Sequence, residues 1–324
     1  MKSPFAKISF AALAALQCAG FAMAAEGWTT DFEAAKKQAA AEHKNLLVDF
    51  TGSDWCIWCK RLDKEVFEED AFKTGVKDKF VLVTLDFPND KSKQSDEVKA
   101  QNKDLQAKYL IKGFPTIMLC DETGKPFAQT GYQSGGPEKY VKSLDLLITN
   151  KKTRDEALSA AEKAEGAAKG KLLYTALKAM KLDDKLSEAF YGDLPAQIKT
   201  LDPKDESGMA KDLAVQERIA TFNKSAMALV RTKEYDAALA LVDNTLKEDG
   251  FDMEAKQNIA MTKASCYMAM GKFDEAEKTC DEVIAMAPGS DTSAHIAEFK
   301  PNIAKMKEMA AKKAAASPEK KTEE

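Results

Sequence analysis

The sequence predicts two domains of different class, an N-terminal α/β domain and a C-terminal all-α domain. Between residues 30 and 148, short runs rich in β-branched and aromatic residues alternate with helical patterns, which is typical of a layered α/β domain. From Arg154 onward such runs vanish, and alanine, lysine, leucine and glutamate dominate. The chain has 324 residues, a length at which two domains are expected.

Residues 1–24 have the pattern of a secretory signal peptide. Lys2 and Lys7 precede an apolar run from Ile8 to Phe21, and Ala22-Met23-Ala24 forms an A-x-A cleavage site. The run is too short to span a bilayer comfortably, although an uncleaved anchor stays an alternative. We therefore expect a mature protein without a membrane span, exported to an oxidising space such as a bacterial periplasm.

Composition excludes some classes of protein without identifying one. After cleavage, 46 basic residues stand against 52 acidic ones, a net charge of −6, and no basic patch is dense enough to suggest nucleic acid binding. The five remaining cysteines are too few for a disulfide scaffold in a chain of this size, so apolar cores must supply the stability. These cysteines are Cys56, Cys59, Cys120, Cys266 and Cys280.

The elements of the first domain follow from local patterns. Residues 30–43 form an amphipathic helical pattern capped by one of its first two residues, and the run NLLVDF at 45–50 predicts a buried strand. After Cys59 the pattern predicts a helix that bends before Phe72. The remaining predicted elements are a strand at 80–85, a helix at 98–110, a strand at 116–120, a short strand around Phe127 and a helix at 137–148.

Three separated motifs in this order resemble the thioredoxin fold, a central mixed sheet flanked by helices. They are Val48-Asp49-Phe50 on a strand, Trp55-Cys56-Ile57-Trp58-Cys59-Lys60 at a helix start, and Gly113-Phe114-Pro115-Thr116 before a later strand. The resemblance covers residues 25–150, and the D-W-C-x-W-C-K version is similar to a branch of exported bacterial thioredoxin-like proteins. No cofactor is implied.

The cysteine spacing fits redox chemistry. Cysteines at i and i+3 lie on one face of a helix, near the Cα separation of about 5.5 Å that a disulfide prefers. A helix N-terminus also favours the thiolate, which is the nucleophile. The resemblance implies that Cys56 attacks and Cys59 resolves the mixed disulfide. Trp55 and Trp58 would flank the pair as an apolar surface for a client chain.

Other site residues follow from the resemblance. It implies that Pro115 has a cis peptide bond and faces the cysteines, with Phe114 and Thr116 beside it in the client site. It also implies that a buried Asp49 assists proton transfer to the resolving cysteine. However, Asp49 precedes Cys56 by seven residues, one more than in ordinary thioredoxins, which leaves open a plain polar residue at a strand end.

The residues around and between the cysteines limit the chemistry. Asp54 and Lys60 are expected to be solvated surface groups. Ile57-Trp58, between the two cysteines, offers no imidazole to stabilise the reduced thiolate. The protein is therefore expected to be a reductase or isomerase and not a powerful oxidant. The two histidines, at positions 43 and 295, do not pair with a cysteine as a closed zinc site requires. Copper held by both thiolates and a third ligand stays an alternative.

The second domain, residues 151–308, contains two segments that match at a period of 38, beginning at Ala226 and Ala264. The second copy resembles a tetratricopeptide repeat at four spaced positions, which predicts stacked helix pairs. These positions are Ala264, Tyr267, Ala276 and Pro288. In an oxidising space Cys266 and Cys280 could bridge its two helices. The polar tail 309–324 is expected to be disordered.

Together these patterns predict an exported thiol–disulfide oxidoreductase. Its partners would be client proteins with disulfides or thiols and a redox partner protein, with the helical repeats binding one of them. The alternative is a repeat-based binding or assembly module whose Cys56–Cys59 bond is a permanent structural disulfide.

Overall fold

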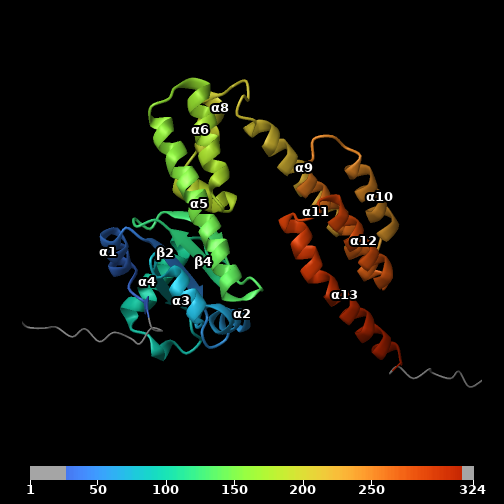
Figure 1. The fold of residues 1–324 in the computed structure, drawn as a ribbon, viewed down its shortest axis with the longest axis horizontal. Coiled ribbons are helices and arrows are strands. Elements are labelled where there is room, and N and C mark those ends of the chain that lie inside the picture. The colour runs from blue at the N-terminus through green and yellow to red at the C-terminus, as the bar shows by residue number, and fades with distance from the viewer. Residues whose placement is uncertain (1–26, 316–324) are drawn as a thin grey trace, which may run out of the picture. The chain divides into compact units, whose positions relative to one another are not determined.

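The computed structural model describes residues 27–315. These residues form two compact units that divide between Ser207 and Gly208 (Figure 1). The predicted signal peptide therefore lies outside the described residues.

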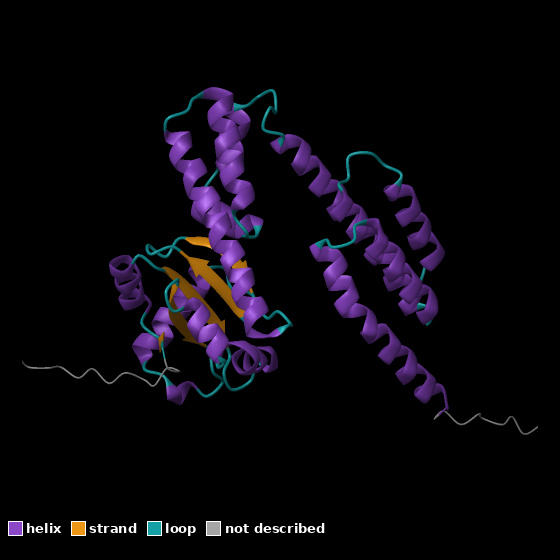
Figure 2. Cartoon of the chain, in the orientation of Figure 1, coloured by secondary structure: helices purple, strands orange, loops and turns teal. Residues whose placement is uncertain are grey.

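The first unit is built on a five-stranded mixed sheet (Figure 2). The strand order is β1-β3-β2-β4-β5, with β1, β3 and β2 parallel and β4 and β5 antiparallel to their neighbours. The predicted strands are all present, and β1 is an additional two-residue strand too short to leave a pattern. The strands are β1 (Trp28–Thr29), β2 (Asn45–Thr51), β3 (Phe80–Asp86), β4 (Thr116–Cys120) and β5 (Pro126–Thr130).

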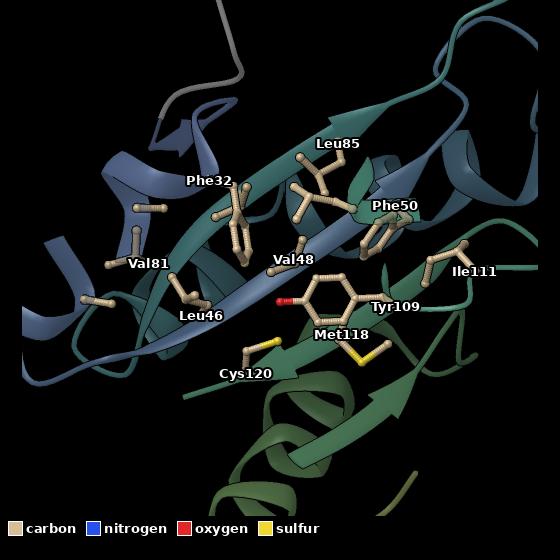
Figure 3. Packing of buried hydrophobic residues seen from close by; sticks show 14 of the residues in the cluster. Phe32, Leu46, Val48, Phe50, Val81, Leu85, Tyr109, Ile111, Met118 and Cys120 are labelled. Atoms are coloured by element: carbon tan, nitrogen blue, oxygen red, sulfur yellow. The ribbon is translucent and has the colours of Figure 1, made fainter. Parts of the chain in front are cut away.

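One face of the sheet is covered by α1 (Phe32–Glu42) and α4 (Asp96–Lys108). Because successive side chains of a strand point to opposite faces, alternate residues of β2 enter this core. Figure 3 shows Val48 of β2 and the ring of Tyr109 packed together in it. The Tyr109 hydroxyl donates a hydrogen bond to the carbonyl oxygen of Gly124 at 2.6 Å. Asp31 caps α1, as the pattern predicted, by accepting a hydrogen bond from the N–H of Ala34.

The opposite face is covered by the helices that follow the cysteines and by the long helix after β5. The helix ends in a π-helical turn and breaks before Phe72, as predicted, because the backbone of Glu69 is extended. Leu47 of β2 packs here with Leu62, so Asp49 and Thr51, which alternate with it, share this face. The elements are α2 (Ile57–Leu62), the π-turn η1 (Asp63–Phe67), α3 (Asp70–Val76) and α5 (Gly136–Glu162); a short 3₁₀ turn, η2 (Lys91–Lys93), precedes α4.

Helix α5 runs without interruption across residue 150, where the patterns place the domain boundary. Arg154 is 4% exposed and donates to the hydroxyl of Tyr191 at 2.5 Å, and that hydroxyl donates to the carbonyl oxygen of Pro126 at 2.6 Å. Lys181 forms a β-bridge with Ala128. These bonds join the helices after residue 150 to the sheet, which is why the observed unit extends to Ser207. The helices are α6 (Gly166–Ala179), α7 (Asp184–Tyr191) and α8 (Leu194–Leu201).

The second unit is entirely helical within its described residues. Its helices are α9 (Met209–Arg231), α10 (Tyr235–Leu246), α11 (Met253–Ala269), α12 (Phe273–Met286) and α13 (Asp291–Ala315). Ala264 and Ala276, predicted as the small residues of the second repeat, are fully buried between α11 and α12. Small side chains at these positions let the two helices approach closely, as expected for stacked helix pairs.

The prediction that disorder begins at Met309 is wrong for residues 309–315, which belong to α13. Their alanine, lysine and methionine residues are strong helix formers, and this propensity extends the helix that the repeat core begins. Residues 316–324 lie outside the described residues.

Candidate active site

The two cysteines lie where β2 passes through a short loop into α2. Cys56 is the N-cap of α2, and its Sγ accepts a hydrogen bond from the N–H of Cys59 at 3.2 Å. The two residues form a disulfide with a Cα separation of 5.3 Å, and their exposed fractions are 5% and 1%. This Cα separation agrees with the distance expected for cysteines three residues apart at a helix start.

The loop before β4 lies beside the cysteine loop. The Phe114–Pro115 peptide bond is cis, which confirms the expected conformation of this bond. The ring of Phe114 meets the indole of Trp55 edge-on, with centroids 5.6 Å apart. Thr116 is buried, and its hydroxyl donates to the carbonyl oxygen of Gly113 at 2.8 Å, so its side chain holds the loop in shape. The tertiary structure thus brings Trp55 and Phe114, one predicted client-site residue from each segment, into contact.

Asp49 is buried in the face of β2 that packs against α2. It is 3% exposed, and within the described residues its Oδ1 has no hydrogen-bond partner. Burial raises the pKa of Asp49 well above its ordinary value, and the nearby carboxylates of Asp63 and Asp86 raise it further. A carboxyl group in this state can hold or release a proton at the pH at which thiols react.

Asp63 is a second acidic group that the sequence patterns did not identify. Burial, with the charges of Glu68 and Asp86, raises the pKa of Asp63 to about 6. Its backbone N–H donates to the carbonyl oxygen of Cys59, one helical turn earlier. The signal that could have found it is this spacing of four residues, which places both side chains on one helix face.

Three large apolar side chains around the disulfide are exposed. Trp55, Ile57 and Trp58 have exposed fractions of 43%, 78% and 53%. The Trp58 ring lies 5.3 Å from the ring of Tyr132, and the guanidinium group of Arg61 lies over both rings. The sequence patterns did not identify Tyr132, because it comes from the distant segment after β5.

Asp54 lies at the surface, as expected, but its carboxylate also forms specific bonds to a neighbouring loop. Its carboxylate oxygens accept hydrogen bonds from the backbone N–H groups of Asn89 and Asp90 at 2.9 and 3.1 Å. These bonds lower the pKa of Asp54. Lys60 is exposed, and its ammonium group donates to the carbonyl oxygen of Asp54 at 2.8 Å. The longer segment between Asp49 and Cys56 is therefore bonded, through Asp54, to the loop that follows β3.

The described part of the chain contains three further cysteines, Cys120, Cys266 and Cys280, and all three are buried free thiols. Burial raises the pKa of each thiol, which disfavours the reactive thiolate. Cys266 and Cys280 are therefore not bridged in this structure. Among residues 27–315, no group of three or more histidine, cysteine, aspartate and glutamate side chains is placed to hold a metal ion. Within the same residues, no helix is both long and apolar enough to span a membrane.

Two family models match the chain. The model of a thioredoxin-like domain matches residues 32–147, and that of a tetratricopeptide repeat matches residues 229–297. Both agree with the resemblances found in the sequence. They place the redox chemistry in the first unit and the repeats in the second.

Curated relatives match the thioredoxin-like part. The chain is 33% identical to "Disulfide bond reductase DsbH" of Chlamydia pneumoniae, over 35% of this chain and 68% of that protein. It is 30% identical to "Thioredoxin-related protein DsbJ" of the same organism, over 32% of this chain and 30% of the relative. It is 31% identical to "Thiol:disulfide interchange protein DsbD" of Actinobacillus pleuropneumoniae, over 30% of this chain and 15% of the relative.

A solved structure titled "DsbH Oxidoreductase" also matches. The two chains are 32% identical, with a TM-score of 0.34, and the match covers 35% of this chain and 78% of that one.

Proposed function

Because the chain belongs to the thioredoxin-like thiol–disulfide oxidoreductases, we propose that its Cys56–Cys59 pair reduces or rearranges the disulfides of exported client proteins. The observation that carries the proposal is the position of the pair. Its disulfide caps a helix, lies beside the Phe114–Pro115 loop, and shares a sheet face with the buried carboxyl of Asp49.

In the proposed cycle, Cys56 is the nucleophile. Its thiolate attacks one sulfur of a client disulfide, forming a Cys56–client bond and releasing the other client sulfur as a thiolate. The thiol of Cys59 then loses its proton and attacks Cys56. This step closes the Cys56–Cys59 disulfide and releases the second client thiolate. The client gains two electrons from the pair. A donor dithiol then supplies two electrons that reduce the Cys56–Cys59 disulfide for the next cycle.

Asp49 is the proposed proton carrier for Cys59. A deprotonated Asp49 accepts the Cys59 proton as that sulfur attacks, and afterwards gives it up to solvent or to the leaving thiolate. Its raised pKa supports this role, because an ordinary carboxyl would be too weak a base to take a proton from a thiol.

The reducing direction is the one we favour. The absence of an imidazole between the cysteines supports it, since a reduced thiolate without such stabilisation gives a weaker oxidant. The name of the DsbH relative, a disulfide bond reductase, supports the same direction.

The proposed location is the bacterial periplasm or another exported compartment. The signal-peptide pattern of residues 1–24 supports this location. The proposed partners are a client with a disulfide or thiol and a redox partner protein. The match of residues 229–297 to a tetratricopeptide repeat supports a protein-binding role for the second unit.

Insulin reduction tests the proposal. The mature protein should reduce insulin when dithiothreitol supplies the electrons, and Cys56→Ser should abolish this activity. Cys59→Ser should instead accumulate mixed disulfides through Cys56, because nothing remains to release the client. Cys266→Ala, which removes a buried thiol in the second unit, is the matched control and should keep wild-type activity. Full activity in both active-site variants would refute the proposal.

A further inference from the structure

We propose that the Asp86–Ser53 contact holds Trp55 as a fixed apolar wall beside Cys56, and that this wall selects polypeptide clients with a large apolar side chain next to their cysteine. Asp86 is thus a positioning residue that acts through Trp55. The proposal rests on the proposed function, because it concerns which disulfides are presented to Cys56.

Asp86 ties the cysteine loop to the core of the first unit. It is the last residue of β3, and its carboxylate accepts two hydrogen bonds from Ser53, one from the N–H at 2.8 Å and one from the hydroxyl at 2.7 Å. The backbone oxygen of Asp86 accepts a hydrogen bond from the side-chain amide of Asn102 at 2.9 Å. Asn102 is 2% exposed on α4, so the backbone of Asp86 is bonded to a buried side chain, while the contact with Ser53 lies at the surface.

Asp54 adds a second tie between the same two loops. Its carboxylate binds the N–H groups of Asn89 and Asp90, directly beyond the end of β3. In addition, the N–H of Phe87 donates to the carbonyl oxygen of Thr51 at 2.8 Å. Every residue from Thr51 to Asp54 except Gly52 is therefore bonded to the segment 86–90. These bonds fix the segment 51–54, and Trp55 follows it directly in the chain.

The support fixes the position of the Trp55 side chain. Its indole Nε1–H donates to the carbonyl oxygen of Phe87 at 2.9 Å, and its edge meets the ring of Phe114. The indole also packs closely on Gly52, where an added Cβ would lie 2.5 Å from Trp55 Cε2. The side chain nevertheless stays 43% exposed. An indole held by three neighbours and open elsewhere presents a surface that is ordered before a client arrives.

A surface of this kind favours a particular client. An aromatic or large aliphatic side chain next to the client cysteine can pack on the exposed indole, and a fixed wall spares the loss of side-chain freedom on binding. Aromatic contacts of this type correspond to roughly tenfold in kcat/KM at most. Glutathione disulfide, which is small and hydrophilic, has no such side chain and gains nothing from the wall.

Two disulfide-bonded peptides that differ only in one residue beside the cysteine, Phe or Ser, test the proposal. The wild-type protein should prefer the Phe peptide by roughly tenfold, mainly through KM. Ser53→Ala keeps the Asp86 charge but loses the hydroxyl bond, and should lower the preference to roughly threefold. Its rate with glutathione disulfide should equal that of wild type. Asp86→Ala, which removes both bonds, should lower the preference further.

Asp90→Ala is the matched control. It removes a carboxylate of the same charge from the segment 86–90. The Asp90 carboxylate accepts hydrogen bonds from Ser92 and none from Ser53, and its backbone N–H still donates to Asp54. This variant should keep the wild-type preference. Ser53→Ala separates positioning from electrostatics, because the Asp86 charge that raises the pKa of Asp49 is still present.

Two results would overturn the proposal. The first is a wild-type protein that reduces the Phe and Ser peptides equally well. The second is a Ser53→Ala variant that retains the full preference, or that loses the same factor on both peptides and on glutathione disulfide. Failure of the proposed function looks different, since the wild-type protein would then reduce none of the three substrates.

Discussion

The indole of Trp55 meets the ring of Phe114 edge-on, and this contact joins two loops that are distant in the sequence. Trp55 precedes Cys56, the proposed nucleophile, and Phe114 precedes the cis-proline. A client chain that contacts one loop therefore lies within reach of the other. This is the arrangement that a disulfide exchange requires, because the client must be held while its sulfur is attacked.

Replacing Asp49 by Asn should change how the rate of disulfide exchange depends on pH. In the wild type the resolving step should speed up with rising pH as Asp49 loses its proton, because only the carboxylate can accept the Cys59 proton. Asp49→Asn should lack this rise and resolve mixed disulfides roughly 100-fold more slowly. Single-turnover reduction of insulin between about pH 5 and 9 measures both effects.

Asp104→Asn is the control for the Asp49 variant, since Asp104 is an exposed carboxylate on α4. It should leave the pH profile unchanged. A pH profile in Asp49→Asn that matches the wild type would remove Asp49 from the proposed mechanism.

Asp63 should make the first unit less stable as pH rises. Its pKa is raised to about 6 in the folded state, so the folded protein binds this proton more tightly than the unfolded chain does. The contribution is fully present below the unfolded pKa of about 3.9 and is lost between about pH 4 and 6. Asp63→Asn should remove this loss and raise the free energy of unfolding at pH 7 by about 1 kcal/mol, less than the full shift of the pKa implies, because solvent screens this partly exposed group.

Urea unfolding at several pH values, followed by tryptophan fluorescence, tests the Asp63 prediction. All three tryptophans, Trp28, Trp55 and Trp58, lie in the first unit, so the signal reports on that unit. Equal pH dependence in the wild type and the variant would contradict the assignment.

Replacing Arg154 by Met should destabilise the first unit by about 2 kcal/mol. The change removes the ion pair with Asp155 and the hydrogen bond to Tyr191, which joins α5 to the end of α7. The same fluorescence measurement reports the loss. Lys152→Met is the matched control, because the Lys152–Glu156 pair is exposed and should contribute nothing measurable. Stability equal to wild type in Arg154→Met would show that the helices after residue 150 are not part of the unit's cooperative fold.

Gln257→Ala should destabilise the second unit by about 2 kcal/mol. Gln257 is fully buried on α11, and its side chain bonds the carbonyl oxygen of Val283 and the hydroxyls of Ser290 and Ser293. Its loss removes a donor from the Val283 carbonyl oxygen and an acceptor from the Ser290 hydroxyl. The Ser293 hydroxyl keeps its bond to the carbonyl oxygen of Ala287. Far-UV circular dichroism should show the earlier unfolding of helices.

Gln216→Ala, at an exposed position of α9, should leave helix unfolding unchanged and serves as the control. The tryptophan signal of the first unit should not move in either variant. A Gln257→Ala variant as stable as wild type would contradict the importance of this buried network.

The elements of the fold were predictable where they depend on local patterns. The run at 45–50 became β2, the capping position at Asp31 began α1, and the cysteine spacing of three gave the observed disulfide. The end of the unit was not predictable, because α5 continues through residue 150 with an ordinary helical sequence. Bonds from Arg154 and Lys181 to distant segments decide where the compact unit ends.

The candidate site likewise has some features that the sequence predicted and others that only the tertiary structure shows. The sequence by itself determined the cysteine pair and the flanking tryptophans, because these are fixed by residue type and short spacing. The resemblance to the thioredoxin fold implied the cis-proline at Pro115, which the structure contains. Only the tertiary structure decided that Asp63 shares the environment of Asp49, that Tyr132 meets Trp58, and that Asp86 supports the loop of Trp55. Burial and contact between distant segments set pKa values and hold side chains in place, and neither is encoded in the spacing of neighbouring residues.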